Sequence, residues 1–118
     1  MRKIIALFLL ISCFVCLVGC RAEPDYSHLI GEALVMIDGV LYIHTGETKE
    51  LEEEHVEVDG QIMARVSENE IPRHNNHSNF GAGYAYRYGK TEGTVEVLMA
   101  EKWYIFATEE IWKEQKIS

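Results

Sequence analysis

The sequence has no cysteine beyond its first twenty residues. All three cysteines, Cys13, Cys16 and Cys20, lie in the N-terminal segment, and residues 21–118 contain none. Disulfide bonds are therefore excluded as a source of stability for the remainder of the chain. A cysteine nucleophile is excluded there for the same reason.

Basic residues are also few. The chain has 11 Lys and Arg against 19 Asp and Glu, for a formal net charge of −8. Leaving out residues 1–19 removes Arg2 and Lys3, so the balance becomes nine basic residues against 19 acidic ones, or −10. A domain of this charge is repelled by nucleic acid and by anionic lipid headgroups. The composition therefore excludes DNA, RNA and basic-patch lipid binding.

Catalytic motifs are absent as well. The sequence contains no Gly-x-Ser-x-Gly, phosphate-binding loop or His-Glu-x-x-His. Ser78 follows His77 directly, but adjacent side chains on an extended chain point in different directions. None of the many glutamates stands out as one of an acid pair. The sequence thus favours a non-catalytic protein, with an envelope enzyme of unknown type as an alternative.

Only one long apolar run is present, from Ile4 to Val18. It follows the basic start Arg2-Lys3 and ends in Leu17-Val18-Gly19-Cys20, which is typical of a secretory signal with a lipid-accepting cysteine. A membrane-spanning helix is the alternative, but it needs about 20 apolar residues and this run is shorter. The pattern resembles that of bacterial lipoproteins. The resemblance implies cleavage after residue 19 and a diacylglyceryl and palmitate anchor on Cys20, which holds the mature chain at the outside of the cell membrane.

The mature chain of 99 residues is long enough for one domain. Residues 21–32 are polar, contain Pro24 and show no periodicity, so residues 20–32 are predicted to be the lipidated cysteine and a linker. Residues 33–118 are predicted to form an extracytoplasmic all-β domain.

The strongest hairpin signal is Asp38-Gly39 between two apolar runs, 33–37 and 40–44. Asp-Gly suits the two positive-φ positions of a type I′ turn. Such a turn places Ile37 opposite Val40 and Val35 opposite Tyr42. Because both faces of this hairpin are apolar, it is predicted to be covered on both sides.

Further strands are predicted along the rest of the domain. Residues 46–54, rich in glutamate, are predicted to form a solvated connection. A second hairpin is predicted around Asp59-Gly60, with Ile62, Ala64 and Val66 on one face. Strands are also predicted at 84–88, 94–99 and 103–107, followed by a short helix from Thr108 onward. The fold class is thus an all-β antiparallel sandwich or a partly closed barrel of successive hairpins, with a short C-terminal helix.

The long segment 67–83 interrupts this pattern and is rich in Asn, His, Ser and Gly. Irregular connections of this length are usually functional or mobile. It leads into a tyrosine stripe of period two, so we predict a binding surface for a peptide, a cell-wall glycan or another envelope protein. The alternative is that the tyrosines belong to the core. The candidate surface consists of Asn76, His77, Asn79, Tyr84, Tyr86 and Tyr88.

A metal site is the competing interpretation of the same loop. His74 and His77 are close in sequence, and His44 or His55 could supply a third ligand. Zinc requires three or four ligands, and the Asn-Asn pair between the two histidines argues against a helix that would align them. No cofactor is predicted.

Three stretches of the chain resemble a family of small lipoproteins of clostridia and related Gram-positive bacteria. They are residues 35–42, 71–84 and 93–103. The family usually has glutamine where this chain has His77, which weakens the metal interpretation. The resemblance implies anchoring to the outer leaflet of the membrane in a single-membrane envelope, and it implies no particular activity.

Overall fold

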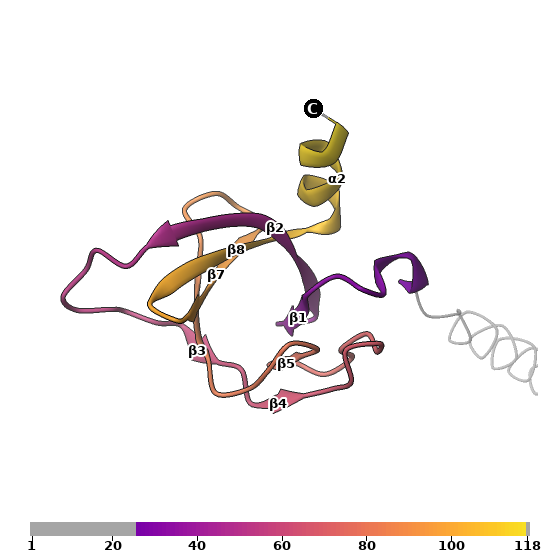
Figure 1. Ribbon diagram of the computed structural model, residues 1–118, viewed down its shortest axis with the longest axis horizontal. Helices are drawn as coiled ribbons and strands as arrows, with labels where there is room; N and C mark the ends of the chain where they lie inside the picture. The colour runs from indigo at the N-terminus through magenta and orange to yellow at the C-terminus, as the bar shows by residue number, and fades with distance from the viewer. Residues whose placement is uncertain (1–25, 118) are drawn as a thin grey trace, which may run out of the picture.

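The computed structural model describes residues 26–117. The predicted signal, Cys20 and the start of the predicted linker lie outside the described residues. The described chain forms one eight-stranded mixed sheet that curls into a half-barrel, followed by one short helix (Figure 1). The prediction of a mostly β fold is therefore confirmed, and the partly closed barrel is formed rather than the sandwich.

The sheet is built from short strands that follow one another along the chain. In chain order, the elements are η1 Ser27–Leu29, β1 Leu34–Ile37, β2 Val40–Glu50, β3 Gly60–Gln61, β4 Ala64–Arg65, β5 His77–Ser78, β6 Ala85–Tyr88, β7 Thr94–Met99, β8 Lys102–Thr108 and α2 Glu109–Ile117. The strand order in the sheet is β3-β6-β7-β8-β2-β1-β5-β4, and β4 with β5 is the parallel pair.

The β1–β2 hairpin forms as predicted. Asp38 and Gly39 have φ angles of 50° and 77°, as a type I′ turn requires. Ile37 lies opposite Val40, and Val35 lies opposite Tyr42. A second turn of this kind, at Ala100-Glu101, joins β7 to β8 with φ angles of 52° and 63°.

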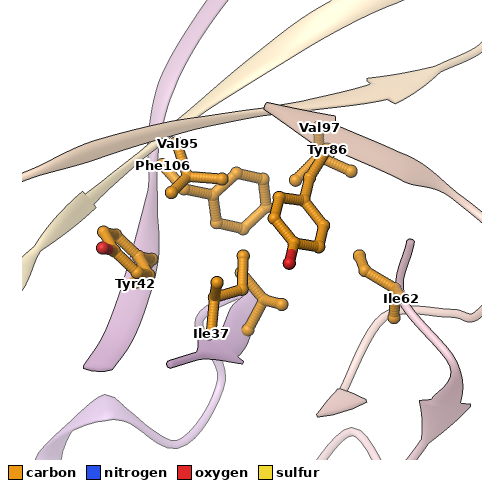
Figure 2. Close-up of a cluster of buried hydrophobic side chains, with 8 residues drawn as sticks. Ile37, Tyr42, Ile62, Tyr86, Val95, Val97 and Phe106 are labelled. Atoms are coloured by element: carbon orange, nitrogen blue, oxygen red, sulfur yellow. The ribbon is translucent and has the colours of Figure 1, made fainter. Parts of the chain in front are cut away.

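Both faces of the β1–β2 hairpin are covered, as predicted. Inside the half-barrel, one cluster of buried side chains fills the space between the strands (Figure 2). It consists of Val35, Ile37, Tyr42, Ile62, Tyr86, Val95, Val97 and Phe106. On the outer face, a second cluster packs the hairpin against η1 and α2. It consists of Leu29, Leu34, Leu41, Ile43 and Trp112.

The prediction of a solvated connection over residues 46–54 was wrong for residues 46–50, because β2 continues to Glu50, whereas residues 51–54 form an irregular connection with exposed glutamates. The second half of β2 pairs with β8, and Lys49 lies opposite Trp103. Gly46 has a φ of 92°, and the register shifts between His44 and Thr48, which is the signature of a β-bulge. The glutamates remain exposed, so backbone pairing forms here without burying charge.

The hairpin predicted around Asp59-Gly60 was also wrong. β3 pairs with β6, and β4 pairs with β5. A Cβ atom at Gly60 would lie 2.4 Å from the Tyr86 hydroxyl, so this position needs glycine for close contact rather than for a turn. The predicted alternation is confirmed, since Ile62 is fully buried while Gln61 and Met63 are exposed.

The two edge strands of the sheet are neighbours in sequence. Between β3 and β4, the Ile62 amide donates to the Tyr84 carbonyl (2.8 Å) and the Met63 amide donates to the Asn76 carbonyl (2.7 Å). One extended segment thus changes partners from β6 to β5 at residues 62–63. This segment, residues 60–65, bridges the open side of the half-barrel, and we call it the closing segment.

Residues 26–32, predicted as part of the linker, belong to the folded domain. Leu29 is fully buried against Trp112 and its neighbours. His28 Nε2 lies 2.5 Å from Glu109 Oε1, and Lys116 Nζ lies 3.5 Å from Glu32 Oε1. We call this segment the N-terminal strap. Within residues 26–117, no helix has the length and apolar character needed to cross a membrane.

Candidate binding groove

A groove of about 830 Å³ opens beside the β1–β2 turn. The N-terminal strap forms one wall, residues 66–74 form the other, and Met36 and Gly39 of the hairpin lie between them. Figure 1 shows the strap and this part of the long loop at the same end of the sheet. The lining residues are Tyr26, Ser27, Ile30, Met36, Gly39, Val66, Asn69, Glu70, Ile71, Pro72, Arg73 and His74.

Apolar and polar side chains share the groove. Ile30 is 49% exposed and presents aliphatic surface to the groove from the strap. Met36 and Ile71 pack against the outer core from the groove side. Asn69, Glu70 and His74 add hydrogen-bonding groups. This combination of apolar surface with a few polar groups is characteristic of ligand sites.

The loop wall is fixed to the end of the hairpin by two asparagines. The Oδ1 atom of Asn75 accepts a hydrogen bond from the Gly39 amide (2.7 Å). The Asn76 amide donates to the Met36 carbonyl (2.7 Å), and Asn76 has a φ of 65°. Asparagine tolerates this left-handed conformation better than most residues. The irregular loop is therefore held in place by the hairpin beside the groove.

Asn79 connects both walls of the groove to the sheet. Its side chain is buried, with Oδ1 accepting from the Leu34 amide (2.8 Å) and Nδ2 donating to the Glu32 carbonyl (2.8 Å). Its own amide donates to the Leu34 carbonyl (3.1 Å). One side chain on the long loop thus fastens the end of the strap and the start of β1.

The six residues of the predicted surface are not brought together on one exposed face. Tyr86 is buried in the inner core, and its hydroxyl donates to Asn76 Oδ1 (3.2 Å). Tyr84 is half-buried, and its ring stacks on Phe80 at 6.3 Å between centroids. Asn79 is buried between the strap and β1. The structure therefore places Tyr86 and Asn79 where their side chains satisfy internal hydrogen bonds.

The two remaining residues of that surface, His77 and Tyr88, lie in separate places. His77 lies in β5, half-buried, with its ring 5.3 Å from that of His74 at the edge of the groove. Tyr88 is exposed at the end of β6, where its hydroxyl donates to Asp38. Of the predicted residues, the His74 and His77 pair is the part that lies next to the groove.

Three tyrosines at this end of the half-barrel lie near the Asp38 carboxylate, and their pKa values are raised. The hydrogen bond from the Tyr88 hydroxyl to Asp38, together with burial, raises the pKa of Tyr88. Burial and, to a lesser extent, the Asp38 charge raise the pKa of Tyr42 and Tyr86. All three phenols therefore remain protonated at neutral pH and can act as hydrogen-bond donors, but not as bases or nucleophiles.

The histidine pair lacks a third ligand for a metal. No cluster of three or more His, Cys, Asp or Glu side chains suited to a metal ion occurs among residues 26–117. The predicted partner His44 instead packs against Tyr104 and Phe106, at 5.6 and 5.2 Å between ring centroids. His74 and His77 alone supply fewer ligands than zinc requires.

The sequence interpretation missed the groove because it assigned one wall to the linker. Tyr26 and Ile30 lie in a stretch that is otherwise polar, and no strand or helix pattern marks them. The available signal was local: Tyr26, Leu29 and Ile30 are three large apolar side chains within five residues. A solvated tether would not need them.

A cluster of charged residues lies elsewhere, on the outer face of β7 and β8. Glu96 is buried between Lys49 Nζ (2.7 Å) and Arg87 Nε (2.8 Å). Arg87 also contacts Glu53 (3.1 Å), and its guanidinium carbon lies 3.8 Å from the centre of the Trp103 ring. Because these charges satisfy one another, we interpret the cluster as structural.

No protein-family model, curated protein or solved structure matches this chain. The interpretation of the groove therefore depends on its own geometry and chemistry.

Proposed function

We propose that this protein is a lipid-anchored, extracytoplasmic binding module without catalytic activity, whose ligand occupies the groove. The observation that carries the proposal is the groove itself, with its half-exposed Ile30 and two walls fixed to β1. Its volume falls within the range of about 300–1,000 Å³ that is usual for ligand sites. Polar groups at its edge would orient the ligand.

Ser78, the serine that follows a histidine in the sequence, has a structural role in the fold. Ser78 is fully buried, and its hydroxyl oxygen accepts hydrogen bonds from the amides of Gly81 (3.0 Å) and Phe80 (3.3 Å). The hydroxyls of Tyr42, Tyr86 and Tyr88 have raised pKa values, so they ionise even less readily than an ordinary tyrosine. A buried hydroxyl that stabilises its own loop is a poor nucleophile, because substrate cannot reach it.

Ligand binding should raise the melting temperature of the protein, because a ligand that binds only the folded state stabilises it by mass action. The experiment measures thermal unfolding of the purified full chain with separate envelope fractions containing proteins, peptides, polysaccharides or lipids. Wild type is expected to gain stability from one fraction. Ile30→Arg, in the groove, is expected to lose that gain.

Val58→Arg is the matched control, since Val58 lies off the groove and is 48% exposed, against 49% for Ile30. It should keep the gain in melting temperature. If no fraction stabilises wild type, or if all three proteins respond equally, the groove is not a binding site and the proposal fails.

The proposed anchor gives a second expected result. Two acyl chains hold a protein at a membrane stably, whereas one chain of about 0.8 kcal/mol per buried CH₂ binds only marginally. Cys20→Ala should therefore leave the protein unprocessed or release it from the membrane fraction. Fractionation of cells followed by immunoblotting measures this. A Cys20→Ala protein that stays membrane-bound at the processed size would contradict the proposed lipidation.

A further inference from the structure

The docked strap brings the groove close to the membrane. Tyr26 already lines the groove, so only residues 21–25 separate it from the proposed lipid on Cys20. A fully extended chain of this length spans about 20 Å. In the anchored protein, which is the premise taken from the proposed function, the groove therefore lies within about 20 Å of the membrane surface at its strap end.

The net negative charge of the domain favours ligands that carry positive charge. Residues 26–118 carry 17 acidic and eight basic side chains, for a formal balance of −9. Glu70 lines the groove, and Asp38 and Glu68, which adjoin the lining residues Gly39 and Asn69 in sequence, are exposed. Arg73 also lines the groove and offsets the charge of Glu70, so the negative field at the groove comes from the rest of the domain surface. Such a surface attracts positively charged ligands and speeds their encounter.

The apolar lining of the groove favours ligands with apolar side chains. Ile30 and Ile71 contribute aliphatic surface from the two walls, and Met36 contributes it from between them. Covering that surface is favourable by roughly 25 cal/mol for each Å² removed from water. A ligand that combines positive charge with apolar side chains would therefore use both properties of the site.

Cationic, amphipathic peptides have this chemistry, and they concentrate at anionic membrane surfaces. Extracytoplasmic segments next to membrane-spanning helices are poorer in Lys and Arg than cytoplasmic ones. A free peptide is therefore a better match than a loop of a membrane protein. We infer that the groove binds a free cationic peptide with apolar side chains at the membrane surface.

The test uses the lipidated mature chain in nanodiscs of zwitterionic phosphatidylcholine, with empty nanodiscs as the blank. The probes are a short fluorescent peptide of leucine and lysine, and its counterpart with glutamate in place of lysine. Fluorescence anisotropy should show saturable binding of the lysine peptide, weakened by salt, and no binding of the glutamate peptide. Ile30→Arg should weaken binding by about tenfold or more, equivalent to about 1.4 kcal/mol.

Val58→Arg adds the same charge outside the groove, so it should weaken binding much less than Ile30→Arg. Equal losses in the two variants would mean that overall charge alone attracts the peptide, and would overturn the inference. Equal binding of the glutamate peptide would overturn it as well. If neither peptide binds while the polysaccharide or lipid fraction still raises the melting temperature through Ile30, the proposed function stands and the peptide inference fails.

Discussion

Glu96→Ala is expected to reduce the free energy of unfolding by about 2 kcal/mol, because it removes charged hydrogen bonds to Lys49 and Arg87, which are themselves partly exposed to water. The Glu96 side chain is 9% exposed and contacts Lys49 at 2.7 Å and Arg87 at 2.8 Å. Without the Glu96 carboxylate, the Arg87 guanidinium stays packed over the Trp103 ring but loses the ion pair with Glu96. Urea unfolding of both proteins measures the difference.

The same residue should make stability depend on pH. Burial alone would raise the pKa of Glu96, but the hydrogen bonds and charges of Lys49 and Arg87 outweigh it, so the pKa is lowered from its usual value of 4.5. A carboxyl with a lowered pKa in the folded state stabilises the fold above that usual value. The stabilisation is lost as the pH falls through the folded pKa. Wild type should therefore lose stability below about pH 4.5, and Glu96→Ala should lack this part of the loss.

Glu53→Gln is the control for this experiment. Glu53 contacts the same arginine at 3.1 Å, but it is exposed to solvent. Exposed ion pairs contribute little because water and salt screen them. An effect of Glu53→Gln as large as that of Glu96→Ala would contradict the assignment of the stabilisation to the buried carboxylate.

Asn79→Ala is expected to cost about 2–4 kcal/mol, because it removes two hydrogen bonds and leaves buried backbone groups unpaired. The Leu34 amide loses its Oδ1 acceptor, and the Glu32 carbonyl loses its Nδ2 donor. Since Glu32 ends the N-terminal strap, the strap should also open more often. Denaturant unfolding measures the cost, and hydrogen exchange of the strap amides measures the opening.

Asn75→Ala provides the matched comparison. Asn75 is exposed and accepts one hydrogen bond, from Gly39, so its loss should cost about 1 kcal/mol or less. Exchange in the strap should stay at the wild-type rate. If both asparagine variants lose the same stability, or if the strap exchanges no faster in Asn79→Ala, Asn79 does not fasten the strap.

Local signals predicted the parts of the fold that depend on neighbours in sequence. Asp38-Gly39 marks its turn because both residues tolerate positive φ, and the register of β1 and β2 follows from the turn. The strands predicted at 94–99 and 103–107 correspond to β7 and β8. In this pair Val95 lies opposite Phe106, and both are buried in the inner core, consistent with the alternation of apolar side chains along each strand.

The roles of Gly60 and of the N-terminal strap were not predicted, because they depend on contacts between residues far apart in the sequence. Gly60 resembles a turn residue, yet its role is set by the ring of Tyr86, 26 residues further along the chain. The strap resembles a linker in sequence. In the fold, Leu29 packs in the same cluster as Trp112, and the Asn79 side chain donates a hydrogen bond to the Glu32 carbonyl. No periodicity within either segment encodes these partners, because each partner lies in a distant part of the chain.

The long loop lies beside the groove, but two of its residues that were predicted to contact a ligand have a structural role instead. Asn76 and Asn79 were predicted to contact a ligand, since amide side chains suit polar recognition. In the fold, these amides pair with the chain itself, because an irregular segment that packs on a sheet needs partners for its backbone groups. The segment does contribute to the groove, through Asn69, Glu70 and His74 rather than through the predicted asparagines.

The closing segment has a consequence for the order of folding. The β1–β2 and β7–β8 hairpins join residues separated by short turns, so little chain entropy is lost when they form. Residues 60–65 instead pair with β6 on one side and with β5 on the other, and the segment between β4 and β6 must be ordered before both pairings can coexist. Contacts of this kind slow folding. We expect the hairpins to form first and Ile62 to enter the core last, so the barrel also opens first at Ile62 when it unfolds.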